Sequence, residues 1–330
     1  MVCFARNIIL LNSCRYNFQY IGWIYVAEEP PKELVRSGII SAKARDYGAS
    51  LIKPGTSCRE ICEAVERYIV ELGAQPAFPC NISINEIAAH YTPGLKDDCT
   101  IPNKGVVKLD VGASIDGYIT DTAVSVALDR SSERLVEAAE RALESVVEAI
   151  KPGIRVYDIG RIIESTVRKM GFKPIRNLSG HSIGRFVIHA GLTIPNYADR
   201  TSWLRRLEPG LVVAIEPFVT KGRGLVVEGK IANIYAVKGK RPTMPLPPLD
   251  ERLLAEASRR FKTMPFTLRW LRGLASDEEL EASAVRLVAS KMLHAYPILI
   301  EVSRSIVAQA EHTFYVGRKE VIVLTLSEAR

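Results

Sequence analysis

Residues 108–122 read KLDVGASIDGYITDT, and this stretch decides most of what the sequence says about the fold. Leu109 and Val111 alternate with Asp110 before the turn signal Asp116-Gly117. An Asp-Gly pair between two segments that read as strands is a strong signal for a β-hairpin. We therefore predict two antiparallel strands, at residues 106–111 and 118–128.

Two aspartates face each other in this predicted hairpin. If the chain turns about Ile115-Asp116, Asp110 lies directly opposite Asp121, with the two Cβ atoms about 4.5–5.5 Å apart. Like charges in that position destabilise a sheet, and buried carboxylates are costly unless they are paired or bound to metal. A divalent cation held by both carboxylates is the economical explanation. In the alternative, one aspartate is exposed to solvent and the other caps a turn.

Further ligand types occur later in the chain. Glycines flank His181 and His189, and glycine allows close approach of the backbone to a site. Glu216 and Glu311 each lie within an apolar segment, where a lone carboxylate needs an explanation. Two Asp, two Glu and one imidazole suit a pair of Mn²⁺, Co²⁺, Fe²⁺ or Zn²⁺ ions better than a thiolate zinc site. Two metal ions about 3.5–4 Å apart are a recurrent device of hydrolases.

The remaining segments predict an α+β protein. Apolar residues at helical spacing predict four helices, and runs of β-branched residues predict further strands. The helices are expected at residues 33–52, 59–72, 132–150 and 156–170, and the strands at 211–219, 225–237, 306–316 and 321–325. A Pro-rich start at 242–248 and helical patterns at 250–261 and 276–293 indicate a small helical insertion between strands.

We divide the chain accordingly. Residues 31–228 and 300–330 are expected to form one catalytic domain, and residues 229–299 a helical insertion subdomain. Residues 1–30 are expected to be an N-terminal extension, either a disordered arm or the product of an over-extended translation start. Its apolar run at residues 8–11 is too short for a signal peptide.

The composition excludes several classes of protein. The chain has 330 residues, of which 47% are hydrophobic and 25% charged, so disordered, collagen-like and coiled-coil proteins are excluded. No apolar stretch approaches the ~20 residues that span a bilayer. The net charge of +7 is spread along the chain, which is typical of a solvated surface and predicts no specific nucleic-acid partner. Six cysteines without a C-x-x-C pair and without an export signal indicate a reducing cytoplasm.

Six motifs, in order, resemble those of type 2 methionine aminopeptidases of archaeal form. They are NEIAAHYTP at 85–93, the hairpin at 108–122, SGH at 179–181, IHAG at 188–191, IEPF at 215–218 and QAEHT at 309–313. The resemblance extends over residues 33–325. It implies the α+β pita-bread (creatinase/aminopeptidase) fold with a helical, winged-helix-like insertion between the last two motifs.

The resemblance also implies a ligand set and a reaction. Five side chains would hold two divalent metal ions (Co, Mn, Fe or Zn), namely Asp110, Asp121, His181, Glu216 and Glu311. His90, His189 and Glu216 would be catalytic, His90 and His189 facing the substrate, and Phe78 and Ile188 would line its methionine pocket. The enzyme would remove the N-terminal methionine from peptides and nascent chains, preferring a small second residue, through water that the metals activate. It would be a cytoplasmic monomer without a membrane partner, working near the ribosome.

Other functions remain to be separated from this one. An Xaa-Pro peptidase of the same fold shares the ligands, and a non-catalytic relative would act as a binding module at the ribosome. Residues 180–184 also fit G-x-S-x-G, the nucleophile elbow of serine hydrolases, but an extended segment follows where a helix is required. Residues 224–231 nearly fit a P-loop, except that Ile231 stands where Ser or Thr must bind Mg²⁺.

Overall fold

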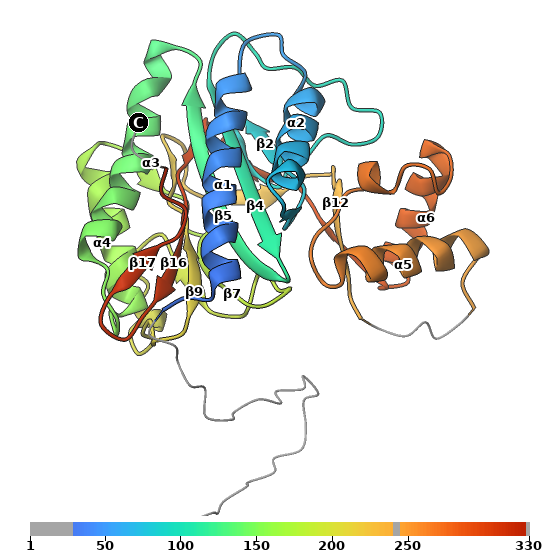
Figure 1. The fold of residues 1–330 in the computed structure, drawn as a ribbon. Coiled ribbons are helices and arrows are strands. Elements are labelled where there is room, and N and C mark those ends of the chain that lie inside the picture. The colour runs from blue at the N-terminus through green and yellow to red at the C-terminus, as the bar shows by residue number, and fades with distance from the viewer. Residues whose placement is uncertain (1–28, 240–244, 328–330) are drawn as a thin grey trace, which may run out of the picture.

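The computed structural model describes residues 29–239 and 245–327 and confirms the α+β prediction. The predicted N-terminal extension lies outside the described residues, apart from its last two. Helices α1–α4 and the main sheets form one body, and α5 and α6 lie to one side of it (Figure 1). Among the described helices, none is long and apolar enough to cross a membrane.

The four helices predicted for the main body form within two residues of their expected bounds. The helices are α1 (Lys32–Leu51), α2 (Cys58–Glu71), α3 (Arg130–Ala149), α4 (Val156–Lys169), α5 (Pro248–Phe261) and α6 (Asp277–Ala289), with 3₁₀ turns η1 (Arg200–Ser202) and η2 (Leu268–Leu271). Side chains cap the N-termini of several helices. Ser57 accepts a hydrogen bond from Glu60 N, Asp129 accepts one from Ser131 N, and Ser276 forms a capping box at the start of α6.

The strands group into five small sheets among the described residues. They are β1 (Gln75–Pro76), β2 (Asn81–Ile84), β3 (Ile87–Ala89), β4 (Val106–Ile115), β5 (Tyr118–Ala127), β6 (Lys173–Pro174), β7 (Ser179–Ile183), β8 (Thr193–Pro195), β9 (Val212–Ile215), β10 (Phe218–Thr220), β11 (Val226–Glu228), β12 (Ile234–Val237), β13 (Leu293–Tyr296), β14 (Leu299–Glu301), β15 (Val307–Gln309), β16 (His312–Val316) and β17 (Val321–Val323). The two largest sheets are β1-β4-β2 with β5 beside β4, and β17-β16-β9-β7-β8.

The hairpin forms, but the predicted register is wrong by two residues. Asp110 pairs with Ala123, and Asp121 pairs with Gly112. The turn is Asp116-Gly117 itself, because both residues adopt positive φ, 51° and 84°, as a two-residue hairpin turn of this hand requires. A slip of two residues leaves a side chain on the same face of the sheet. The two carboxylates are therefore diagonal neighbours on one face rather than directly opposed.

Three predicted strands are each divided in two. The segment 211–219 breaks at Glu216-Pro217, 225–237 breaks between β11 and β12, and 306–316 breaks at Ala310-Glu311. Proline has no N–H to donate to a ladder, which ends β9 before Pro217. The sequence pattern also missed β13, which follows α6 and begins at the last residue of the segment predicted as helix at 276–293.

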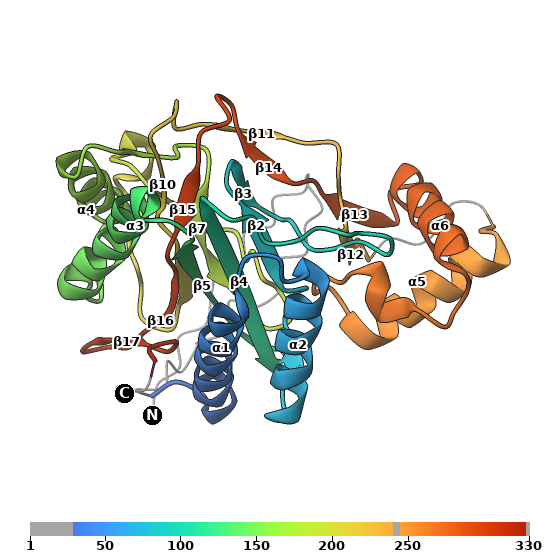
Figure 2. The same cartoon turned by 90° about the horizontal axis from the view of Figure 1, so that it is seen from above.

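The helices cover the sheets in separate groups. Seen from above, α1 and α2 lie against β4 and β5, while α3 and α4 lie on the other side of the molecule (Figure 2). Each pair has its own apolar core: Cys62, Val65 and Ile69 of α2 pack with residues of β4, and α3 and α4 pack with β9, β10 and β16. These cores fix the strands that carry the polar residues described below.

Residues 245–296 form a third packing unit. Leu253 and Ala257 of α5, Leu280 and Ala284 of α6 and the aromatic Phe266 share a core distinct from the other two. Strands β12 and β13 pair antiparallel and join this unit to the rest of the chain.

Candidate metal centre

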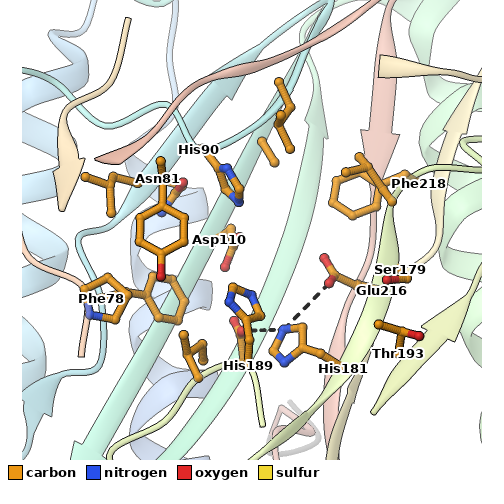
Figure 3. Close-up of a pocket in the computed structure, with 18 of the residues that line it drawn as sticks. Phe78, Asn81, His90, Asp110, Ser179, His181, His189, Thr193, Glu216 and Phe218 are labelled. Carbon is orange, nitrogen blue, oxygen red and sulfur yellow. Dashed lines mark ion pairs between the residues drawn. The ribbon is translucent and has the colours of Figure 1, made fainter. Parts of the chain in front are cut away.

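Five polar side chains from three strands and two links converge inside the main body, and Figure 3 shows Asp110, His181 and Glu216 among them. Asp110 lies on β4, Asp121 on β5 and His181 on β7. Glu216 lies in the link between β9 and β10, and Glu311 in the link between β15 and β16. Two of the three strand breaks that the sequence pattern missed therefore coincide with the two glutamates.

The distances bring these groups within reach of a shared cation. His181 Nε2 lies 3.6 Å from Asp121 Oδ2 and 3.7 Å from Glu216 Oε1. Ligand atoms of Asp121, His181 and Glu311 all lie within 4.8 Å of one another. Gln309 ties the two glutamates together, since its Nε2 donates to Glu216 Oε2 at 3.2 Å and to Glu311 Oε2 at 3.4 Å.

Close packing of two strands places His181. It stands opposite Ala214 of β9, and the preceding Gly180 has no room for a side chain. A Cβ at Gly180 would lie 2.3 Å from the Ala214 carbonyl oxygen. The glycine is therefore required by the backbone of β9, which also carries the chain to Glu216.

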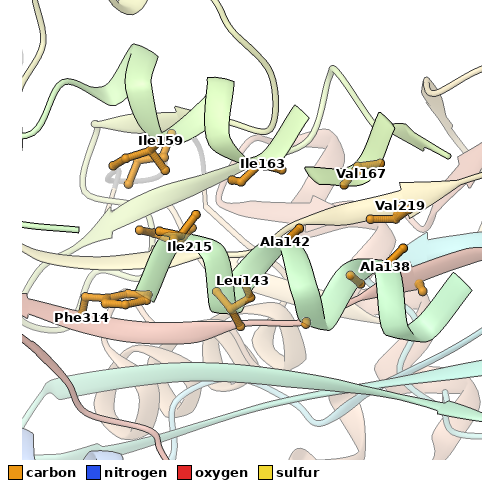
Figure 4. Packing of buried hydrophobic residues seen from close by; sticks show 14 of the residues in the cluster. Ala138, Ala142, Leu143, Ile159, Ile163, Val167, Ile215, Val219 and Phe314 are labelled. Carbon is orange, nitrogen blue, oxygen red and sulfur yellow. The ribbon is translucent and has the colours of Figure 1, made fainter. Parts of the chain in front are cut away.

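The apolar core fixes the residues next to both glutamates. Ile215, immediately before Glu216, and Phe314, three residues after Glu311, are fully buried among side chains of α3 and α4 (Figure 4). Because such cores are close-packed, the polar groups beside them have little freedom to separate.

The pKa shifts of the five side chains favour the binding of a cation. Burial raises the pKa of Asp121 to about 7, and burial followed by charge repulsion from Asp121 raises the pKa of Asp110, Glu216 and Glu311 well above the ordinary range. Burial lowers the pKa of His181 to about 4, so that its ring is neutral at neutral pH, the form in which histidine binds metal.

Unpartnered oxygens give an independent test of the fit. Asp110 Oδ1, Asp121 Oδ1 and Glu311 Oε1 are buried and have no hydrogen-bond partner. Buried carboxylate oxygens in proteins normally have partners. Oxygen donors with one imidazole suit divalent ions such as Mn²⁺, Co²⁺, Fe²⁺ or Zn²⁺. The residues present therefore fit a cation site.

A cavity of about 340 Å³ opens beside the centre. Each sequence-predicted substrate residue lines it: Phe78, His90, Ile188 and His189. His90 Nδ1 lies 3.2 Å from the Pro297 carbonyl oxygen. A carbonyl only accepts, so in the neutral ring Nδ1 carries the proton and Nε2 is an acceptor.

Both predicted catalytic histidines are neutral at neutral pH. Burial lowers the pKa of His90 to about 4 and that of His189 to about 3. The His189 ring packs edge-on against His181, with the ring centroids 4.5 Å apart. By contrast, His312 bonds Thr325 Oγ1 at 3.0 Å through Nδ1 and does not line this cavity.

Tyr296 and Gln309 are among the polar residues at the site that sequence reasoning missed. Tyr296 of β13 lines the cavity, and its ring lies 5.8 Å from that of His90 and 6.4 Å from that of His189. Nothing local in the sequence marks it, because β13 itself was not predicted. Gln309 belongs to the QAEHT motif at 309–313. Its position two residues before the predicted ligand Glu311 was the sequence feature that could have identified it as a site residue.

Comparisons with known proteins identify the family. Residues 32–242 match the model of metallopeptidase family M24. The chain belongs to metallopeptidase family M24. It is also similar to two curated proteins named methionine aminopeptidase. It is 43% identical to that of Saccharolobus solfataricus over 92% of this chain and 100% of the relative, and 43% identical to that of Pyrococcus abyssi over 89% and 98%.

Solved structures show that this M24 metallopeptidase has the pita-bread fold. A methionine aminopeptidase from Thermotoga maritima superposes with a TM-score of 0.66 at 23% identity, covering 92% of this chain and 100% of that one. A thermophilic Arx1 superposes with a TM-score of 0.79 at 16% identity, covering 90% and 91%. At these identities the structures support the fold alone.

Proposed function

We propose that this M24 metallopeptidase is a methionyl aminopeptidase, which hydrolyses the bond after the N-terminal methionine of peptides and nascent proteins. The observation that carries the proposal is 42–43% identity to methionine aminopeptidases along 98–100% of their length. The polar centre and its adjoining cavity supply the chemistry that such a reaction needs.

Five residues would hold two divalent ions: Asp110, Asp121, His181, Glu216 and Glu311. The unpartnered oxygens of three of them support this assignment. When bound, the ions would polarise the substrate carbonyl and lower the pKa of water so that hydroxide forms near neutral pH. Their identity among Co, Mn, Fe and Zn belongs to the proposal.

Glu216 is the proton carrier in this mechanism. Its Oε2 accepts from Gln309, and its carboxyl borders the cavity. It takes a proton from the attacking water and delivers it to the leaving amine. The neutral ring of His189 donates a hydrogen bond to the oxygen that gains charge, and His90 Nε2 accepts one from the N–H of the scissile amide.

The cavity provides the specificity. Phe78 is 7% exposed and Ile188 is 6% exposed, and both share an apolar cluster with Ala77 and Met264. Methionine is flexible and apolar, and a pocket of aromatic and aliphatic groups suits it. A preference for a small second residue is part of the same proposal.

The wider cellular setting is part of the same proposal. Substrates are nascent chains, so the enzyme acts in the cytoplasm, as a monomer, close to the ribosome. The positive net charge of +7 is compatible with a position near ribosomal RNA. Residues 229–299 form the inserted subdomain beside a catalytic domain of residues 31–228 and 300–330, and the separate core of α5 and α6 supports that division.

Turnover of Met-Ala-Ser tests the function. Chelator-treated enzyme is assayed with and without added Co²⁺ or Mn²⁺, and we expect release of methionine that depends on the added ion. An Xaa-Pro dipeptide tests the alternative peptidase. Hydrolysis of the Xaa-Pro substrate without Met-Ala-Ser turnover, or inactivity on both with metal bound, overturns the proposal.

A further inference from the structure

Two thiols lie in contact outside the metal centre. Cys58 begins α2, and Cys99 lies 41 positions later in the loop between β3 and β4, yet their Sγ atoms are 2.9 Å apart. Both are free cysteines. We propose that Cys58 and Cys99 form an oxidative modification site, at which a small-molecule disulfide converts the two thiols into an intramolecular disulfide.

The backbone holds the two cysteines side by side. Ser57 and Thr100 form an isolated antiparallel bridge, which places Cys58 opposite Cys99. Cys58 N donates to the Cys99 carbonyl at 2.9 Å. This single hydrogen bond holds the two backbones side by side, while Cys99 N donates to Asp97 Oδ1 at 2.9 Å. Because the Sγ atoms are already 2.9 Å apart, they need to approach by only about 0.9 Å to reach the S–S bond length of about 2.0 Å.

The two thiols differ in reactivity. Cys58 is 0% exposed, and its hydrogen bond to Cys99, followed by burial, raises the pKa of its thiol far above the ordinary value. Cys99 is partly exposed. The hydrogen bond from Cys58 is the main cause that lowers the pKa of Cys99 to about 7. Since the thiolate is the nucleophile, Cys99 reacts first at neutral pH.

The reaction balances as two exchanges. The Cys99 thiolate attacks one sulfur of an external disulfide such as glutathione disulfide, whose S–S bond breaks and releases one thiolate. Cys58 then gives up its proton and attacks Cys99 Sγ, and the second half of the external disulfide leaves as a thiolate, which is protonated to a thiol. The two protein thiols lose two electrons in total, and the external disulfide gains them as two thiols.

The disulfide would fix the loop between β3 and β4, which contacts α2 on one side and Arg272 on the other. Arg59 of α2 donates to the carbonyls of Gly94 at 3.1 Å and Asp97 at 2.7 Å. On its other side the loop accepts at Leu95 O from Arg272 at 2.6 Å. Figure 2 shows this connection between β3 and β4 running towards α6. A covalent tie restricts the unfolded chain, so the oxidised protein should melt at a higher temperature.

The surroundings favour a disulfide over a metal site. A metal site needs three or more His, Cys, Asp or Glu side chains close enough to share an ion. In the described part of the chain, the residues that meet this condition are Asp121, His181 and Glu311, and neither cysteine is among them. Cys62, one turn along α2, has its Sγ directed to the Cys80 carbonyl at 3.3 Å instead. Cys58 and Cys99 are therefore left as a pair.

Mass spectrometry after oxidation tests the site. Reduced full-length protein is treated with glutathione disulfide at pH 8, and the peptides are then mapped. We expect a Cys58–Cys99 link, with the loss of two hydrogens. Cys58→Ser should stop at a stable glutathione adduct on Cys99, and Cys99→Ser should leave Cys58 unmodified. Cys62→Ala, a change on the same helix, should oxidise like the wild type.

Thermal unfolding gives a second readout. Oxidation should raise the Tm of the wild type and of Cys62→Ala by several degrees and leave that of Cys99→Ser unchanged. Circular dichroism of each variant checks that it folds. A lasting glutathione adduct on wild-type Cys99, an internal link between other cysteines, or no reaction at Cys99 would each overturn the proposal.

Discussion

Glu216 is the residue whose chemistry can be isolated most cleanly. Glutamine has nearly the same size and keeps one oxygen, but it cannot take up a proton. We predict that Glu216→Gln lowers kcat on Met-Ala-Ser by about 10²–10⁴-fold, the contribution of general acid–base catalysis. Steady-state assays at matched metal content measure the change. The matched control is Glu208→Gln, which changes an exposed glutamate on the loop before β9. Turnover by Glu216→Gln at the wild-type rate would refute the role of Glu216 as proton carrier.

Protonation of His90 makes the stability of the folded protein depend on pH. Its folded pKa is about 4, below the ordinary 6.5, so the unfolded chain binds the proton more tightly. The stability contributed by the neutral ring is fully present above pH 6.5 and is lost as the pH falls towards 4. Because the ring keeps some exposed surface, we expect a loss on the order of 1–3 kcal/mol.

Denaturant unfolding of metal-free protein at pH 7 and pH 4.5 measures this effect. We predict that His90→Asn loses less stability between these two pH values than the wild type, because the variant has no ring to protonate. Its pH profile is compared with that of His294→Asn, which replaces a histidine that is largely exposed. Parallel profiles for the wild type and His90→Asn would contradict the prediction.

At the scale of elements, one buried ion pair joins α2 to η2. Arg269 donates to Glu66 through both terminal nitrogens, at 3.0 and 2.8 Å, and Trp270 Nε1 donates to the same carboxylate at 2.8 Å. The side chains of Arg269 and Glu66 are only 2% and 8% exposed. Removing one partner of such a pair leaves an uncompensated buried charge.

We predict that Arg269→Met lowers the free energy of unfolding by about 3–5 kcal/mol. The double change Arg269→Met with Glu66→Leu should recover most of this loss, because no buried charge then remains. Arg141→Ala removes the exposed pair with Glu144, where both side chains are more than half exposed, and should cost less than about 1 kcal/mol. Equal losses in Arg269→Met and Arg141→Ala would show that the buried pair has no special role.

The elements also show where prediction from sequence succeeded and where it stopped. Helical periodicity and caps such as Ser57 and Asp129 are local signals, so α1–α4 were predicted closely. The register of the hairpin depends on which two residues adopt positive φ, and the prediction assigned that role to Ile115-Asp116 instead of Asp116-Gly117. A β-branched isoleucine is a poor residue for such a turn.

The candidate site was predictable for a different reason. Carboxylates and histidines within apolar segments are costly unless they share a partner, so each of the five ligand candidates was conspicuous by itself. Tyr296 carries no such signal, since an exposed or buried tyrosine needs no special explanation. Its place beside His90 depends on the pairing of β12 with β13, which no local pattern encodes.

At the scale of the whole molecule, the fold holds several carboxylates close together, and a bound cation would reduce the repulsion between their charges. Strands β4 and β5, and the links between β9 and β10 and between β15 and β16, bring together four carboxylates, two of them buried and two partly buried. For Asp121, the folded pKa of about 7 lies above the ordinary 3.8. The folded chain therefore binds this proton more tightly, and the contribution of Asp121 to the stability of metal-free protein falls as the pH rises from about 4 to about 7. Above pH 7 the destabilisation by the Asp121 charge should be complete.

Asp121→Asn separates this repulsion from metal binding. At pH 8 without metal, we predict that the variant has a higher Tm than the wild type, because one buried charge is gone. Mn²⁺ should reverse the order: a ligand at 100 times its Kd stabilises by about 2.7 kcal/mol, and the variant has lost a carboxylate ligand. Differential scanning calorimetry with and without Mn²⁺ measures both changes, and Asp98→Asn, at an exposed position, is the control. If Mn²⁺ stabilised Asp121→Asn as much as the wild type, Asp121 would not hold the ion; if the metal-free variant melted below the wild type, the buried charge would not be the source of the instability.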